Sequence, residues 1–247
     1  MDMVNGFIYL GRGARLLMHK ELRVFVLLPL LINFLLFILG VVLIFSYAGG
    51  WVDEILSHLP SWLAWAAWLL WALLGLLLVM SIFWGFNLVG NMIAAPFNGI
   101  LAERTQMLLT GTPQEGGGVG DFLRMIPGAL GREISKWLYY LPRVLVLFIL
   151  SFIPGINLLV PWLWLAFAAW MMAVQYVDYP MDNNGISFKA MGKRLRQRKL
   201  LHLSFGGGVS LLLLVPVVNF FVMPLAVVGA TALWVDEHGA QVAVEAT

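Results

Sequence analysis

Charged residues divide the chain into four long stretches that contain none of them. These stretches cover residues 24–52, 55–102, 144–177 and 200–235. Bilayer interiors exclude unpaired charges, a helix rises about 1.5 Å per residue, and the hydrocarbon core is about 30 Å thick. The pattern therefore predicts two long membrane helices, over residues 24–52 and 62–102.

The two later stretches each have a middle interrupted by proline. The segments IPGINLLVP, residues 153–161, and VPVVNFFVMP, residues 215–224, form a weak internal repeat. Proline removes a backbone donor and ends a helix, but it suits the first turn of the next one. Each stretch is therefore expected to be a helix, a break and a second helix, with the second arms starting near Pro161 and Pro224.

Length decides how deep these hairpins reach. The third and fourth stretches hold 34 and 36 residues, whereas two full crossings need about twenty residues each plus a turn. We therefore interpret residues 144–177 and 200–235 as re-entrant, half-penetrating hairpins that enter from the cytoplasm. Four ordinary crossings remain an alternative, because Lys136, Arg143 and Lys199 can extend the arms by snorkelling.

The fifteen basic residues indicate the topology. They fall within residues 12–23, 104–143 and 189–199, and the loop of residues 53–61 has none. By the positive-inside rule, residues 1–23, the segment 103–143 and the tail 236–247 are cytoplasmic. The predicted fold is a single all-α integral membrane domain over residues 1–247, with two long transmembrane helices, two re-entrant helical hairpins and amphipathic cytoplasmic helices.

Composition agrees with a membrane protein and narrows the chemistry. Apolar residues make up 61% of the chain and charged residues only 11%. The absence of cysteine excludes disulfides and thiolate chemistry, and the four histidines lie on separate segments, which argues against a metal site. The charge balance of +2 does not suggest nucleic acid. Nucleotide, hydrolase and metalloprotease motifs are missing, so we expect neither an enzyme nor a cofactor.

Polar residues within the apolar stretches are the candidates for an ion pathway. They are Asn91, Asn98, Glu103, Arg104, Asn157 and Asn219. Hydrogen bonding between helices is the alternative role for the asparagines. Arg23 precedes the first apolar stretch, where the amides of a helix start and a guanidinium can meet one oxyanion. Its alternative role is snorkelling and orientation in the membrane.

Several long segments resemble the CysZ-type sulfate permeases of bacterial inner membranes, and together they cover nearly the whole chain. They are LRVFVLLPLLINFLLF (22–37), NMIAAPFNGILAE (91–103), YYLPR (139–143), FIPGIN (152–157), QYVDYPMDN (175–183) and MPLAVVGATALWV (223–235). The resemblance implies two long transmembrane helices, two pairs of half-penetrating helices and a homo-oligomer. It also implies that sulfate enters the cytoplasm for sulfur assimilation and cysteine biosynthesis.

The family's sulfate-binding segment, Gly-Leu/Ile-Arg-Arg, corresponds to Glu21-Leu22-Arg23-Val24 in this chain. The resemblance thus implies sulfate binding at Leu22 and Arg23, although the glycine and the second arginine are replaced. The alternative places sulfate selection at Asn91, Asn98, Glu103 and Arg104.

The resulting hypothesis is channel-like or ion-coupled sulfate transport without ATP hydrolysis. The competing hypothesis is a non-transporting membrane scaffold or assembly factor that docks partners through its basic cytoplasmic segments.

Overall fold

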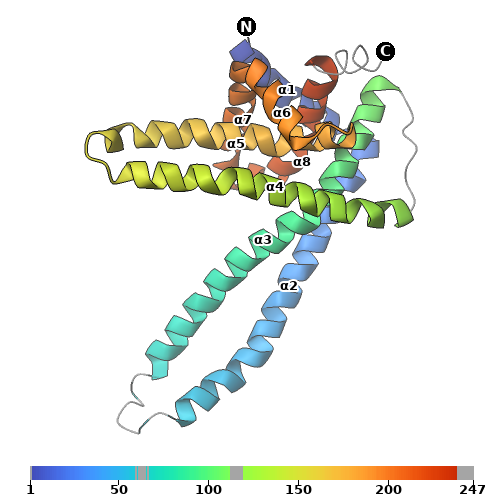
Figure 1. Ribbon diagram of the computed structural model, residues 1–247. Helices are drawn as coiled ribbons and strands as arrows, with labels where there is room; N and C mark the ends of the chain where they lie inside the picture. Colours follow the sequence, from blue (N-terminus) through green and yellow to red (C-terminus); the bar gives the residue numbers. More distant parts are fainter. Residues whose placement is uncertain (1, 59, 61–64, 66, 112–118, 238–247) are drawn as a thin grey trace. The chain divides into compact units, whose positions relative to one another are not determined.

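A computed structural model describes residues 2–58, 60, 65, 67–111 and 119–237 (Figure 1). All regular secondary structure in these ranges is helical. No strand occurs in these ranges, which confirms the all-α prediction. The helices are α1 (Asp2–Leu17), α2 (Lys20–Ser57), α3 (Ala67–Thr110), α4 (Val119–Ser151), the short 3₁₀ helix η2 (Ile156–Leu158), α5 (Val160–Asn183), α6 (Phe188–Gln197), α7 (Lys199–Leu213) and α8 (Pro216–Glu237).

The chain divides into two compact units. The smaller consists of Leu27–Ala94, and the larger combines Met1–Val26 with Ala95–Thr247. Most of α2 and α3 belongs to the smaller unit, whereas the ends of these two helices belong to the larger one.

The smaller unit consists of two long apolar helical segments, and its described residues form no core. None of its described side chains is buried, and many of the exposed ones are large and apolar, such as Phe34, Leu39 and Trp68. Burial of such side chains is normally a main source of stability. These segments therefore need lipid or another protein surface around them.

Both long helices run further than their sequence patterns indicated. Helix α2 continues past the predicted end at residue 52 and ends at Ser57. Helix α3 continues past the predicted end at residue 102 to Thr110, and Pro96 lies inside it. A proline inside a helix can kink it without ending it. Residues 61–64 and 66, at the start of the second predicted helix, lie outside the described residues.

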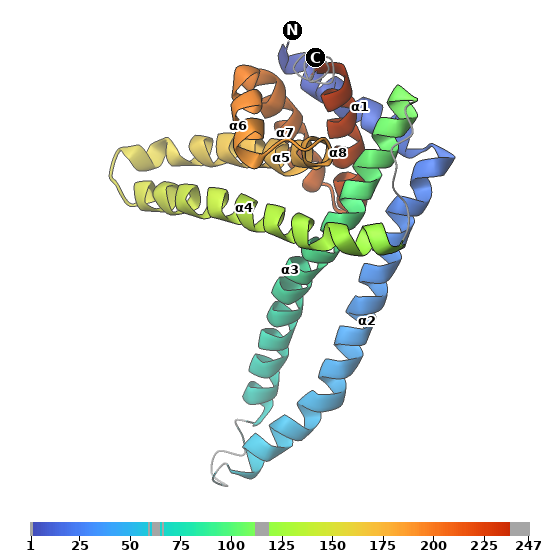
Figure 2. The same cartoon turned by 45° about the vertical axis from the view of Figure 1, so that its right-hand side comes forward.

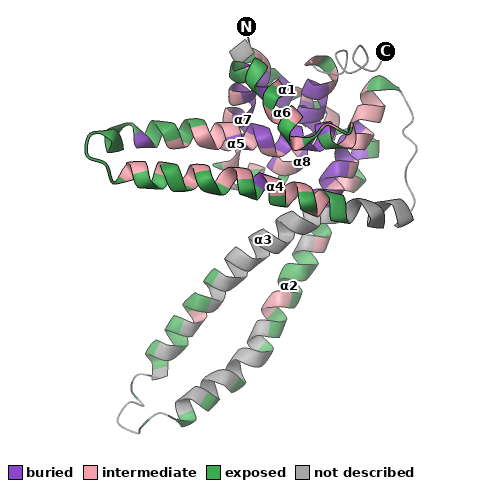
Figure 3. Ribbon diagram, in the orientation of Figure 1, coloured by how far each residue is buried: buried purple, intermediate pink, exposed green. Residues whose placement is uncertain are grey.

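The core of the larger unit lies where α1, α7 and α8 meet the carboxyl-terminal half of α5, and buried residues gather there in Figure 3. Trp234, Phe205 and Leu233 are among its largest fully buried side chains. Glycines let the helices approach closely. A Cβ atom at Gly206 would lie 1.8 Å from the backbone oxygen of Ala169, so this contact between α7 and α5 requires glycine.

Helices α4 and α5 form an antiparallel hairpin, which is visible in two views (Figures 1 and 2). The break falls at the predicted place, because α4 ends at Ser151 and Gly155 has a φ of 83°. Glycine adopts this left-handed conformation without steric cost. Pro161 lies in the first turn of α5, as expected for a helix start.

The arms of this hairpin are longer than the uncharged stretch suggested. Within the described residues, Pro127–Ser151 and Val160–Asn183 are long and apolar enough to cross a membrane, judged by length and composition. Helix α4 starts at Val119, so it includes charged residues that lie before residue 144. The arm lengths counted from residues 144 and 177 were therefore too short, because the helices continue through charges that have partners.

The second hairpin consists of α7 and α8, which a turn at Leu214 and Val215 separates. Helix α8 starts at Pro216, and Pro224 lies inside it. The expected start of this arm near Pro224 is therefore wrong, whereas the expected break is present. Pro216 occupies the first position of the helix, where its missing N–H has no intrahelical partner to lose.

Helix α6 is amphipathic, as the sequence predicted for the non-spanning helices. Met191 and Leu195 are buried on one side, while Lys189 and Lys193 are exposed on the other. Ser187 caps the helix, because its hydroxyl accepts a hydrogen bond from the amide of Ala190.

Candidate functional site

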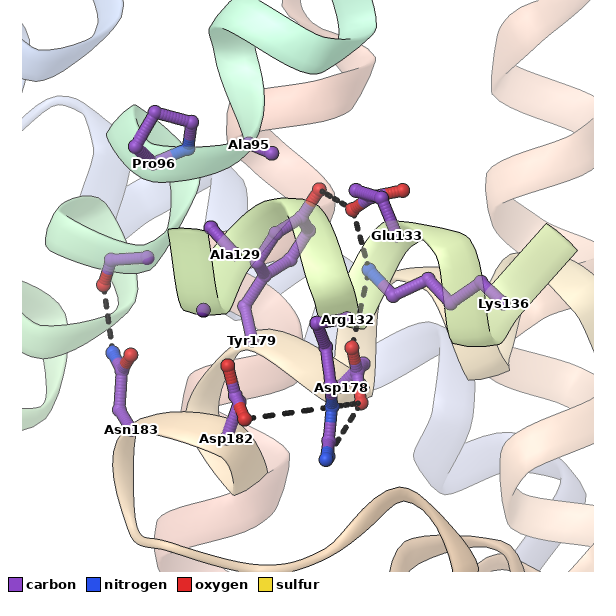
Figure 4. A pocket seen from close by; sticks show the side chains of 12 residues that line it. Ala95, Pro96, Ala129, Arg132, Glu133, Lys136, Asp178, Tyr179, Asp182 and Asn183 are labelled. Atoms are coloured by element: carbon purple, nitrogen blue, oxygen red, sulfur yellow. Dashed lines mark hydrogen bonds and ion pairs between the residues drawn. The ribbon is translucent and has the colours of Figure 1, made fainter. Parts of the chain in front are cut away.

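A cluster of charged side chains joins α4 to α5 at the end of the hairpin opposite its turn (Figure 4). Arg132 and Lys136 lie one turn apart on α4, and Asp178 and Asp182 lie one turn apart on α5. Residues four positions apart share a helix face. The two basic side chains of α4 therefore meet the two acidic side chains of α5.

Asp178 is the centre of this cluster. Its Oδ1 atom accepts a hydrogen bond of 2.8 Å from Nε of Arg132, and its Oδ2 atom lies 3.1 Å from Nζ of Lys136. The side chains of Asp178 and Lys136 are only 1% and 4% exposed. Breaking such a buried pair by removing one partner typically costs about 3–5 kcal/mol, because the remaining charge is left uncompensated.

Glu133 and Tyr179 hold Lys136 from another side. Nζ of Lys136 lies 2.7 Å from Oε1 of Glu133 and 4.3 Å from the centre of the Tyr179 ring. The Tyr179 hydroxyl donates a hydrogen bond to Glu133 Oε1 at 3.3 Å. The ammonium group therefore has a carboxylate and an aromatic face as partners in addition to Asp178.

The last part of α3 borders the same cluster. Asn98 is buried, and its Nδ2 atom donates a hydrogen bond of 3.4 Å to the Tyr179 hydroxyl. Asn183 donates a hydrogen bond of 2.7 Å to the backbone oxygen of Gly99. These polar contacts attach α3 to the carboxyl-terminal end of α5.

A pocket of about 310 Å³ opens between these three helices. It is lined by Ala95, Pro96, Gly99, Gly128, Ala129, Arg132, Glu133, Lys136, Asp178, Tyr179, Asp182 and Asn183. The lining carries two basic and three acidic side chains, a formal charge of −1. The cations are therefore neutralised in this arrangement, and a free anion gains little from them.

The structure places the two residues of the predicted sulfate-binding segment very differently. The Leu22 side chain is fully buried in the core, whereas Arg23 is exposed. Nε of Arg23 donates a hydrogen bond of 3.0 Å to the backbone oxygen of Met18, in the turn between α1 and α2. The backbone N–H of Leu22 donates a hydrogen bond of 3.1 Å to the backbone oxygen of His19, so of these two residues only Arg23 is exposed to a ligand.

Of the pathway residues predicted on α3, Asn98 alone joins the pocket cluster through a described contact. Glu103 and Arg104 lie further along the helix and are half-buried, and the Arg104 guanidinium carbon is 5.9 Å from the centre of the Phe25 ring. The side chain of Asn91 lies outside the described residues.

Asn157 and Asn219 lie at the two hairpin breaks, and both are exposed. Asn157 belongs to η2, and Asn219 lies in the first turn of α8. Their backbone N–H groups donate hydrogen bonds to the backbone oxygens of Ile153 and Val215, respectively. Neither asparagine is among the residues that line the pocket.

Sequence reasoning missed the charged cluster itself, namely Arg132, Glu133, Lys136, Asp178 and Asp182. The signal was present as two pairs of like charge, spaced four residues apart, at the facing ends of one predicted hairpin. Among the described residues, no group of three or more histidine, aspartate or glutamate side chains is arranged to hold a metal ion.

Comparisons with known proteins identify the family. Residues 9–224 match the family model described as "Sulfate transporter CysZ/Etoposide-induced protein 2.4". A protein named sulfate transporter CysZ from Pseudomonas fluorescens (strain Pf0-1) is 45% identical over 240 residues, covering 97% of this chain and 96% of the relative. A protein of the same name from Pseudomonas aeruginosa (strain LESB58) is 42% identical, covering 97% of this chain and 98% of the relative. Another, from Pseudomonas fluorescens (strain SBW25), is 48% identical, covering 96% of this chain and 94% of the relative. The chain therefore belongs to the sulfate transporter CysZ/etoposide-induced protein 2.4 family.

Proposed function

We propose that this chain carries sulfate across the bacterial inner membrane into the cytoplasm, where the sulfate supplies sulfur assimilation and cysteine biosynthesis. The observation that carries the proposal is the similarity of this chain, over 97% of its length, to relatives named sulfate transporter CysZ. The sequence contains no nucleotide-binding motif, so the proposed route is channel-like or ion-coupled and does not hydrolyse ATP.

The distribution of exposed apolar side chains supports a membrane location. In the described part of the smaller unit no side chain is buried, and the outward sides of α4 and α5 expose Leu138, Leu145 and Leu165. Exposed apolar area of this extent indicates lipid or protein contacts. We propose that lipid covers part of it and that further copies of the chain cover the rest in a homo-oligomer.

The proposed topology keeps both termini in the cytoplasm. The α4–α5 and α7–α8 hairpins then enter the membrane from the cytoplasmic side with their turns leading. The charged cluster supports this orientation, because it lies at the end of the α4–α5 hairpin away from the turn. Charges near the aqueous side cost less than charges at the bilayer centre.

We place the first contact with sulfate at the turn between α1 and α2. Arg23 is exposed there, one of its guanidinium N–H groups is held by Met18, and α2 begins at Lys20. Helix starts and arginine are both suited to oxyanions, since they supply oriented N–H donors and positive charge. The pathway residues proposed to follow are Asn91, Asn98, Glu103, Arg104, Asn157 and Asn219.

Uptake of radiolabelled sulfate into proteoliposomes tests the function. Vesicles that contain the purified chain should accumulate more label than empty vesicles, and excess unlabelled sulfate should suppress the signal. Chloride at equal ionic strength is the matched control and should leave it in place. Uptake equal to that of empty vesicles would contradict transport and favour a membrane scaffold that docks partners through residues 189–199.

A further inference from the structure

We propose that the pocket between α3, α4 and α5 contains a second oxyanion site. Arg132 and Lys136 form this site, and Asp178 closes it in this structure. The inference rests on the proposed sulfate transport and adds a place where the transported ion is held. The ligand is sulfate or another tetrahedral oxyanion, because these ions present several oxygens to neighbouring cations.

The geometry of Asp178 is that of an internal substitute for such an ion. Its two carboxylate oxygens are divided between two cations, with Oδ1 on Arg132 at 2.8 Å and Oδ2 on Lys136 at 3.1 Å. Figure 4 shows the carboxylate between the two basic groups. A sulfate ion also offers separate oxygens to two donors, and charge-assisted hydrogen bonds of this kind are strong.

Both cations keep other partners when Asp178 is taken away. Nη2 of Arg132 donates a hydrogen bond of 2.8 Å to the backbone oxygen of Ile186. Lys136 remains 2.7 Å from Glu133 and above the Tyr179 ring. The cation pair is therefore held in position without Asp178, and an incoming oxyanion meets donors that are already oriented.

The pocket has room for the exchange. Its volume is about 310 Å³, and part of its lining consists of small residues, among them Ala95, Gly99 and Gly128. A water molecule occupies about 30 Å³ of liquid, so the space can hold an oxyanion together with several waters. Sulfate would otherwise lose its hydration without replacement, which is costly for a strongly hydrated ion.

The charge balance explains why the site is closed at rest. Arg132 and Lys136 face three carboxylates, so the pocket carries a formal charge of −1 while Asp178 is in place. A dianion adds to this charge unless Asp178 withdraws. Sulfate and Asp178 therefore compete for the same two cations, and the aspartate prevents the cation pair from binding other anions.

Calorimetry on the full chain in detergent tests the competition, with sulfate as the titrant and an Arg23→Ala background that removes the other proposed contact. Adding Asp178→Asn to this background should tighten sulfate binding at least about tenfold, because one competing charge is lost. Asp182→Asn is the matched control. It removes a charge from the same pocket, but Asp182 is 43% exposed and lies 3.4 Å from Arg132, so its effect should stay below about threefold.

Lys136→Gln, added to the Asp178→Asn variant, should abolish the gain in affinity. The proposal is overturned if Asp178→Asn and Asp182→Asn change the affinity equally, or if the gain survives without Lys136. Because the binding measurement requires no transport, it decides the site alone, whereas absent uptake by the wild-type chain contradicts only the transport function.

A second comparison decides the proposal if the Asp178→Asn chain does not fold. Lys136→Gln in the otherwise unchanged protein keeps the Arg132–Asp178 pair, and sulfate uptake should fall at least about tenfold. Lys136→Arg, which retains the positive charge, should restore at least about a third of the wild-type rate. Uptake by Lys136→Gln within about twofold of wild type overturns the proposed site.

Discussion

Leu22 and Arg23 are adjacent, yet they have opposite surroundings, and this contrast explains how a short segment can present one side chain. The Leu22 side chain is fully buried among the core residues, which fixes the start of α2. Arg23, the next residue, is exposed and is tied to the Met18 oxygen. The neighbouring Glu21 is exposed as well and weakens the local positive potential, so sulfate binding at this turn should depend strongly on Arg23.

Replacing Arg23 with alanine should weaken sulfate binding by about 1.5–3 kcal/mol, because a charge-assisted hydrogen bond is lost. Calorimetry with the purified chain measures this change. Arg15→Ala is the matched control, since Arg15 is an exposed basic residue in the last turn of α1, and its loss should have little effect. An unchanged affinity for Arg23→Ala would limit Arg23 to a role in topology.

The charged cluster shows what residue patterns could not reveal. Counting charges predicted four uncharged stretches, and that count placed Arg132 and Lys136 in the cytoplasmic segment 103–143, outside the apolar stretch of residues 144–177. In the structure both lie within α4 and are neutralised by Asp178, which lies 46 and 42 positions later in the chain. The sequence shows spacing along one helix, but it does not show which distant helix supplies the partner.

At the scale of helices, the larger unit depends on close approach at glycines. Gly206 of α7 packs directly against the backbone of α5 at Ala169. Gly13 of α1 and Gly229 of α8 also meet closely, since a Cβ atom at Gly13 would lie 2.8 Å from the amide nitrogen of Gly229. Small residues that permit such backbone contact are a common basis of helix packing in membranes.

Gly206→Ala should destabilise the chain by about 1–3 kcal/mol, because the added methyl group meets backbone atoms that cannot rotate away. Unfolding in mixed detergent micelles measures the free energy. Gly207→Ala is the matched control, as its Cβ atom would lie 3.8 Å from the Ala169 side chain, an ordinary contact. It should be neutral or gain up to about 1 kcal/mol from helix propensity. Equal stability of the two variants would contradict the close contact.

The elements themselves were largely predictable from local chemistry. The all-α class and both hairpin breaks were confirmed, and Pro161 begins α5 as expected. The predicted arm start near Pro224 was wrong, because this proline lies inside α8. A proline in sequence does not reveal whether its neighbours tolerate a missing hydrogen bond, since packing against other helices can stabilise the interrupted segment.

At the scale of the whole molecule, the depth to which the hairpins enter the membrane was predicted from the lengths of the uncharged stretches. The described helices of the α4–α5 hairpin are longer than that prediction assumed. Pro127–Ser151 and Val160–Asn183 hold 25 and 24 residues, enough for a full crossing of about 30 Å. The half-penetrating arrangement therefore remains a proposal that arm length does not favour for this hairpin. Accessibility from the periplasm distinguishes it from four full crossings.

If both hairpins are half-penetrating, as their uncharged stretches predict, single cysteines at Asn157 and Asn219 should resist an impermeant thiol reagent added from the periplasm. The natural chain has no cysteine, so each introduced thiol is unique. Ser57→Cys is the matched control. Ser57 is exposed and lies within residues 53–61, the loop without basic residues that the positive-inside rule places outside the cytoplasm, and it should react readily. Reaction of both turn positions as fast as position 57 would establish full crossings.

The turn between α4 and α5 also has a practical consequence for isolating this protein. Loops usually expose polar side chains, yet Phe152, Leu158 and Leu159 are 71%, 75% and 62% exposed at this one. Without a lipid or protein cover, these side chains form an exposed apolar patch through which separate molecules can aggregate during purification.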